Sequence, residues 1–283
     1  MIELLLEPFQ FAFFRNGTVT AVLAGALCGL LGVYIVLRGM SYIGHGLSHA
    51  IFGGAVVSFV MSWNFYLGAG LWGFGAAVLI NQTTRRTKIG ADAAIGVITT
   101  ASFAIGVALI SRYRRFTQSI DAALFGNILG VKPEDLLVVA GVTLMVGVAV
   151  FFTYRQLLFT TFDPSVAQVY GVPTQWIDTL FALALAAAII ASMKILGVTL
   201  IAAALVVPAI TARLLTDSFH RMVFLSVTIG ALTGLAGMYL SYYIDVASGA
   251  TIVLTQSALF AVALLVTGLR KRAAGRLAHV HVG

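Results

Sequence analysis

Charged residues are scarce in this sequence. Asp, Glu, Lys and Arg together make up 10% of the 283 residues, whereas soluble globular domains carry about 25%. Hydrophobic residues make up 60%, and the mean hydropathy is +1.02. These values exclude an ordinary soluble domain and indicate a membrane protein that crosses the bilayer many times. The net charge of +7 therefore does not indicate nucleic-acid binding, because basic residues are expected at the ends of membrane spans.

Several chemical motifs are also missing. Cys28 is the only cysteine, which excludes a disulfide framework and a thiolate metal cage. No G-x-x-x-x-G-K-[ST] sequence occurs, so the chain alone does not cradle a nucleotide phosphate. His45 and His49 have the spacing of the zinc-protease motif H-E-x-x-H, but Gly46 replaces the glutamate that would act as general base. The stretch Val246–Gly249 is one residue short of an intramembrane serine-protease motif. The sequence therefore does not predict an enzyme.

Long apolar segments dominate what is present. A membrane-spanning helix needs roughly 20 apolar residues, and nine segments come close to or reach that length. The predicted fold is an all-α membrane helix bundle with nine transmembrane helices, or eight if one of the two shortest segments is re-entrant. Residues 1–272 are expected to form a single transmembrane domain and residues 273–283 a disordered tail. The nine segments are Thr18–Leu37, Ile43–Met61, Phe65–Ile80, Ala93–Ser111, Leu136–Thr153, Thr179–Met193, Ile195–Leu215, Val223–Tyr242 and Thr251–Leu269.

The distribution of Lys and Arg predicts the orientation. Cytoplasmic loops carry an excess of basic residues. If the loop with Arg85, Arg86 and Lys88 is cytoplasmic, nine crossings place eleven of the 17 Lys and Arg residues inside and six outside. The N-terminus is then expected outside and the C-terminus in the cytoplasm, although the cluster Arg112–Arg115 falls on the outer side.

Glycine spacing predicts close helix contacts. Gly25 and Gly29 are four residues apart, as are Gly230 and Gly234. Small residues at this spacing let helix backbones approach closely in lipid. The spacing favours a tight bundle and says nothing by itself about function.

The most informative residues are His45 and His49, which lie inside an apolar run. Residues four apart share one face of a helix, and titratable groups at membrane depth are costly and usually functional. Neutral imidazole is a common ligand of transition metals, and two histidines supply half of a tetrahedral site. Asp245 and Asp92, at span ends, are possible further ligands. Two other interpretations remain: hydrogen bonds from the histidines to neighbouring helices, and a proton relay.

One cytoplasmic loop has the signals of a short helix. Asp163 can cap the helix, and Pro164 fits its first turn. Gly171 fits the position after the helix end, and Pro173 follows. This pattern predicts a short exposed helix that is either a docking element or an interfacial connector.

Taken in order, several segments resemble the membrane permeases of zinc-, manganese- and iron-type ABC importers. The stretch Arg38–Ala50 resembles the signature R-x-x-S-L-x-G-D-A-[IL]-S-H-[AS]. Further similar segments are Asp92–Val97 (D-x-A-I-G), Leu124–Gly130 (L-F-G-x-I-L), Phe162–Pro173 (F-D-P-x-x-A-x-x-x-G-[VI]), Ile195–Arg213 (V-G-x-L-L…P-A-A-x-A-R) and Asp245–Gly249 (D-x-P-S-G). The matches run in the family's order from about residue 20 to about residue 270, and this ordered set is specific.

The resemblance implies partners and a location. It implies a homodimeric permease in the bacterial cytoplasmic (inner) membrane, with two copies of a separate ABC ATPase and an extracytoplasmic metal-binding protein. ATP would bind the ATPase, and the permease would hold no permanent cofactor. The short helix would be the segment that couples to the ATPase. By the family motif, its candidate coupling residues are Asp163, Pro164, Ala167, Gly171 and Pro173.

The resemblance also implies the metal path. In the family, the pathway metal meets the signature aspartate and the histidine four residues later. Here His49 matches the histidine, while His45 stands at the aspartate position. A nitrogen ligand in place of oxygen suits zinc better than manganese, so zinc is the favoured metal and manganese and iron are the alternatives. The alternative function is a stand-alone ion-coupled transporter or channel that uses the two histidines as a proton or metal relay.

Overall fold

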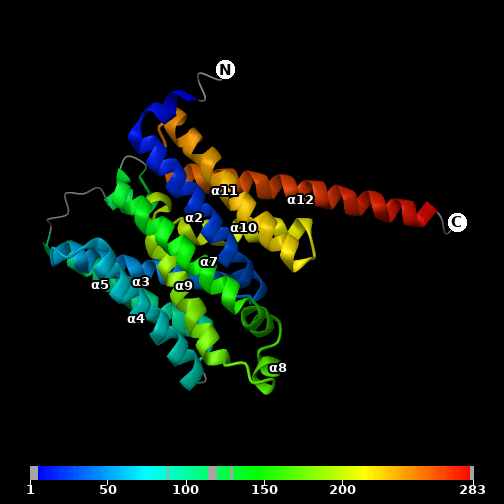
Figure 1. Ribbon diagram of the computed structural model, residues 1–283, viewed down its shortest axis with the longest axis horizontal. Helices are drawn as coiled ribbons and strands as arrows, with labels where there is room; N and C mark the ends of the chain where they lie inside the picture. Colours follow the sequence, from blue (N-terminus) through cyan, green and yellow to red (C-terminus); the bar gives the residue numbers. More distant parts are fainter. Residues whose placement is uncertain (1–5, 88, 114–119, 128–129, 281–283) are drawn as a thin grey trace.

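The computed structural model describes residues 6–87, 89–113, 120–127 and 130–280. Lys88, Arg114 and Arg115, which entered the orientation argument, lie outside these ranges, as do residues 281–283 of the predicted tail. Within them every regular element is a helix and no strand occurs, which confirms the all-α prediction (Figure 1). The elements are η1 (Glu7–Gln10), α2 (Ala12–Leu37), α3 (Ser41–Val60), α4 (Phe65–Arg86), α5 (Ala91–Tyr113), α6 (Ile120–Phe125), α7 (Pro133–Phe162), α8 (Pro164–Val169), α9 (Thr174–Leu196), α10 (Ile201–Leu215), α11 (Phe219–Ile244) and α12 (Ser248–Val280).

Eight of the nine predicted segments coincide with one helix each, and the ninth, Ile195–Leu215, covers the end of α9 and all of α10. Among these nine helices of the described ranges, seven are long and apolar enough to cross a membrane: α2, α3, α5, α7, α9, α11 and α12. The other two are α4, with 22 residues, and α10, with 15 residues. The two segments that looked short in the sequence are longer in the structure, because α4 continues through Asn81 and Arg85 and α9 begins before Asp178. These polar ends are helical because their side chains have partners in neighbouring helices.

The segment predicted as Ile195–Leu215 is not one continuous helix. The chain leaves the helical conformation at Gly197, whose φ is 75°, and α10 starts only at Ile201. The freed backbone groups bind the end of α6, since Val198 N donates to Ala123 O (3.1 Å) and Thr199 N to Leu124 O (3.2 Å). Non-helical backbone is tolerated at membrane depth when protein groups satisfy it in this way.

Glycines set a close helix crossing between α2 and α11 (Figure 1). A Cβ on Gly25 would overlap the carbonyl oxygen of Gly230, and a Cβ on Gly29 would overlap that of Ser226. Ser226 Oγ donates a hydrogen bond of 2.7 Å to Gly29 O across the same crossing. The predicted glycine contacts are therefore confirmed.

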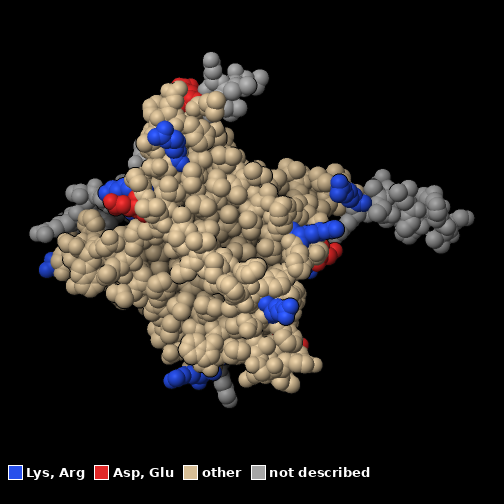
Figure 2. All heavy atoms as spheres, viewed as in Figure 1, with Lys and Arg blue, Asp and Glu red and all other residues tan. Residues whose placement is uncertain are grey.

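Helices α3, α4 and α5 pack together on one side of the bundle, and α12 extends away from it on another (Figure 1). The space-filling view shows a surface that is mostly uncharged, with Lys and Arg in a few separate small patches (Figure 2). This distribution suits a chain whose lateral surface faces lipid.

Candidate metal centre

The two histidines of α3 lie against each other. His45 Nε2 and His49 Nε2 are 3.1 Å apart, and the ring centroids are 4.5 Å apart at an interplanar angle of 83°. Both residues are half-buried. Tyr42 lies beside His45 and Phe103 beside His49, with ring centroids 5.6 and 4.7 Å away. The spacing along the helix thus brings both Nε2 atoms to one point, as predicted.

Small residues on α3 fix the helix that carries the pair. A Cβ on Gly46 would overlap a methyl group of Ile95 in α5, and a Cβ on Gly53 would overlap the carbonyl oxygen of Ser102. The backbones of α3 and α5 can approach closely because these side chains are absent. Ser48 Oγ donates to His45 O at 2.8 Å, so this hydroxyl satisfies its own helix and does not point a free donor at the imidazoles.

The distance between the two nitrogens suits a shared metal ion. Zn–N bonds of about 2.0–2.1 Å at a tetrahedral angle separate two ligand nitrogens by about 3.3–3.4 Å, close to the 3.1 Å observed. Without metal, one Nε2–H donates to the other Nε2. His49 Nδ1 is buried and has no hydrogen-bond partner among the described residues, whereas a metal-bound histidine usually donates its second N–H. Two nitrogens would be half of a tetrahedral site, and the described residues give His49 Nδ1 no acceptor.

The two candidate carboxylates do not join this pair within one chain. Asp92 is exposed in the first turn of α5. Asp245 is exposed at the end of α11 in a left-handed conformation, with φ 57°. Across the described ranges, no group of three or more His, Cys, Asp or Glu residues is placed to hold a metal. The segment after Asp245 instead supports the break between α9 and α10, since Ser248 Oγ donates to Ile195 O at 3.0 Å.

The predicted short helix is present as α8. Asp163 Oδ1 accepts a hydrogen bond of 2.9 Å from Val166 N, and Pro164 occupies the first turn. Gly171 has φ 78°, which glycine adopts readily, and Pro173 precedes α9.

The two sides of α8 differ in exposure. Ala167 faces the bundle and is fully buried, whereas Val169 and Tyr170 are 85% and 75% exposed. The helix therefore presents an apolar end outside the bundle.

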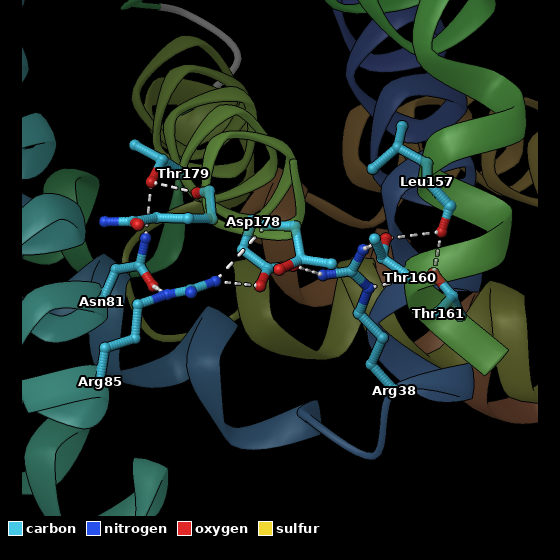
Figure 3. A network of polar contacts seen from close by, with 10 residues as sticks. Arg38, Asn81, Arg85, Leu157, Thr160, Thr161, Asp178 and Thr179 are labelled. Carbon is cyan, nitrogen blue, oxygen red and sulfur yellow. Dashed lines mark hydrogen bonds and ion pairs between the residues drawn. The ribbon is translucent and has the colours of Figure 1, made fainter. Parts of the chain in front are cut away.

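A polar network lies at the same end of the molecule as α8. Arg38 Nη1 and Arg85 Nη2 approach Asp178 from two sides, each bound to a different carboxylate oxygen (Figure 3). Arg38 also donates to Thr160 (2.9 Å) and Thr161 (3.1 Å) at the end of α7. Sequence reasoning did not identify this network. The available signal was Asp178 itself, a carboxylate next to a long apolar run.

Arg38 is the most buried member of the network. Its side chain is 8% exposed, against 32% for Asp178 and for Arg85. Burial lowers the pKa of the Arg38 guanidinium, and the Asp178 carboxylate opposes this shift. Arg38 also stacks on Phe181, with Cζ 4.7 Å from the ring centroid.

The arrangement of helices and the histidine pair can be compared with known proteins. Residues 10–267 match the family model described as the ABC 3 transport family. The chain belongs to this family. The resemblance seen in the sequence is thereby confirmed, and the chain is a permease subunit of an ABC metal importer. A stand-alone transporter is not favoured.

Individual relatives of this chain support its assignment to the ABC 3 transport family. It is 38% identical to a manganese transport system membrane protein of Halalkalibacterium halodurans, over 91% of this chain and 88% of that protein. It is 33% identical to a chelated iron transport system membrane protein of Yersinia pestis, over 100% and 98% of the two chains. A solved structure of PsaBC from Streptococcus pneumoniae in complex with Fab aligns with a TM-score of 0.83 at 34% identity, over 93% of this chain and 95% of that chain.

Proposed function

We propose that this permease carries a divalent transition metal into the cytoplasm of a bacterium, driven by ATP hydrolysis on a separate ATPase, and that the ion passes between His45 and His49 of two copies of the chain. The observation that carries the proposal is the 3.1 Å separation of the two Nε2 atoms. One chain supplies two nitrogens, and a second copy across a two-fold axis would supply two more, the number that a tetrahedral ion takes. An extracytoplasmic protein would deliver the metal.

The choice of metal depends on His45. The relatives named above are described as manganese and iron systems, and manganese and iron remain candidates. Imidazole at position 45, in place of the family's carboxylate, favours zinc, because nitrogen donors suit zinc better than manganese.

Replacing His45 by aspartate is therefore expected to shift the preference from zinc towards manganese by about tenfold or more, the effect of roughly 1.4 kcal/mol in ligand binding. The measurement is uptake of radioactive manganese in competition with unlabelled zinc. The matched control is His220→Asp. His220 lies at the start of α11, with its Nε2 2.9 Å from the Tyr154 hydroxyl of α7. This variant should leave the preference unchanged. Retained uptake with an unaltered preference in His45→Asp would refute the role of this residue in choosing the metal.

The same proposal assigns α8 to ATPase docking and its end of the bundle to the cytoplasm. Support comes from the exposed apolar end of α8 and from basic residues on the same side, since Arg38, Arg85 and Pro164 line one cavity. Basic residues at this end agree with the positive-inside rule.

Replacing the exposed Tyr170 by aspartate is expected to reduce copurification of the ATPase at least about tenfold, because interface hot spots are enriched in tyrosine and their loss costs about 2 kcal/mol or more. Tyr170 is 75% exposed, so the permease itself should fold. Trp63→Asp, in the turn between α3 and α4 and 47% exposed, is the control and should retain the ATPase. Full ATPase binding and full uptake in Tyr170→Asp would instead favour a transporter that works without this contact.

A further inference from the structure

Arg38 occupies the corner between α2 and α3, seven residues before His45. Its three guanidinium nitrogens bind three different residues on two other helices: Thr161 and Thr160 on α7 and Asp178 on α9. The guanidinium group presents its donors in a fixed fork, so all three bonds hold only while the α2–α3 corner, α7 and α9 keep their relative positions. One side chain thus reports the arrangement of three helices.

The α7 partners of Arg38 lie next to α8. Thr160 and Thr161 are among the last residues of α7, and Asp163, two residues further, caps α8. Both threonines are nearly buried. A movement of α8 would therefore act on the hydrogen-bond acceptors of Arg38 through a very short stretch of chain.

The space around the network is a cavity of about 340 Å³. Its lining includes Arg38, Asp178, Thr160 and Pro164, together with Ile43 and Leu47 of α3. Ile43 and Leu47 are each two residues from His45, so they lie on roughly the opposite face of α3 from the imidazoles. The cavity thus separates the back of the metal helix from the start of α8.

The cavity is not arranged as an anion site. The guanidinium groups of Arg38 and Arg85 already donate to the chain's own oxygens, including both oxygens of Asp178 (Figure 3). Arg85 also donates to Asn81 Oδ1 at 3.0 Å within its own helix. The open volume instead provides room for the Arg38 side chain and for α3 to change position.

We propose that Arg38 is the positioning residue that transmits movement of the ATPase-docking segment α8 to the metal helix α3. This inference rests on the proposed function of α8 and of the histidine pair. In this arrangement α8 shifts the end of α7, the bonds from Thr160 and Thr161 pull on Arg38, and Arg38 moves the start of α3 and hence His45.

Arg85 provides a matched comparison. It binds the second oxygen of Asp178 and has the same exposure as Asp178, but its hydrogen bonds go only to α4 and α9. Loss of either arginine leaves Asp178 paired with the other one. A purely structural role in neutralising Asp178 would therefore be shared by both arginines, whereas transmission from α8 belongs to Arg38 alone.

The test uses the complete importer in proteoliposomes, with radioactive zinc and manganese each supplied alone. ATP hydrolysis and metal uptake are measured for Arg38→Gln and Arg85→Gln. The expected result for Arg38→Gln is a fall of at least about fivefold in metal taken up per ATP, a coupling change of about 1 kcal/mol. ATPase binding and metal binding to the permease should persist. Arg85→Gln should keep the ratio within about twofold of the wild type.

A second variant tests the proposal even if Arg38→Gln does not fold. Thr160→Val combined with Thr161→Val removes the two hydroxyls but keeps the side-chain shape and leaves the Arg38–Asp178 pair intact. It should show the same loss of coupling. An unchanged ratio in this double variant, or equal losses in Arg38→Gln and Arg85→Gln, would overturn the proposal. If the proposed function itself were wrong, the wild-type complex would show no ATP-dependent uptake at all.

Discussion

Replacing His49 by alanine is expected to reduce ATP-dependent metal uptake by at least about a hundredfold. Loss of a residue that merely supports a metal ligand costs about 10–100-fold in affinity or activity, and His49 would be a ligand itself. Its Nε2 lies 3.1 Å from that of His45. Once His49 is gone, only the His45 imidazole remains on α3. The measurement is uptake of radioactive zinc and manganese by the reconstituted complex.

Ser48→Ala is the control for this variant. Ser48 is fully buried beside His49, but its hydroxyl binds only His45 O within the same helix. Uptake in this variant should stay within about threefold of the wild type, because a net hydrogen bond of this kind is worth only about 0.5–1.5 kcal/mol. Wild-type uptake by His49→Ala would remove the histidine pair from the transport path.

Replacing Gly25 by leucine is expected to lower the free energy of unfolding by about 3 kcal/mol or more, at or beyond the upper end of ordinary overpacking. A Cβ at this position meets the backbone carbonyl of Gly230, which no rotamer change can move aside. Helices α2 and α11 must separate, and this is their closest crossing. The measurement is the unfolding midpoint of the purified permease in detergent.

Gly141→Leu in α7 is the matched substitution, because nothing lies within 4 Å of a Cβ there. Its midpoint should remain near that of the wild type. Equal midpoints for the two variants would show that the α2–α11 contact is looser than the structure describes.

Much of the fold follows from the sequence, because each helix that crosses lipid needs a long apolar segment, and such segments are visible in the sequence. Eight of the nine predicted segments coincide with one helix each, and the ninth is broken at Gly197. The errors lie where polar residues have tertiary partners. Asn81 and Asp178 look like loop residues in the sequence, but Asn81 donates to Thr179 at 2.7 Å and Asp178 binds two arginines. The break at Gly197 was missed because its backbone groups are satisfied by α6, more than 70 residues earlier in the chain.

The parts of the candidate site that are formed by residues close together in the sequence were predictable. The i, i+4 spacing placed His45 beside His49, and the capping residues located α8. The sequence did not reveal the pairing of Arg38 with Asp178, because these residues are 140 positions apart. For the same reason Asp92 and Asp245 could be named only as candidates at span ends. Within one chain, neither forms a three-residue metal group in the described ranges.

X-ray absorption spectroscopy of the purified complex loaded with zinc tests the central claim most directly, since it reports the ligands of the ion itself. The expected spectrum shows imidazole scattering from about four nitrogens at about 2.0–2.1 Å, with one ion for every two permease chains. The imidazole signal should fall by at least half in His49→Ala, because only His45 of each chain remains. A shell of oxygen ligands without imidazole scattering in the wild-type complex would contradict a metal site built from His45 and His49.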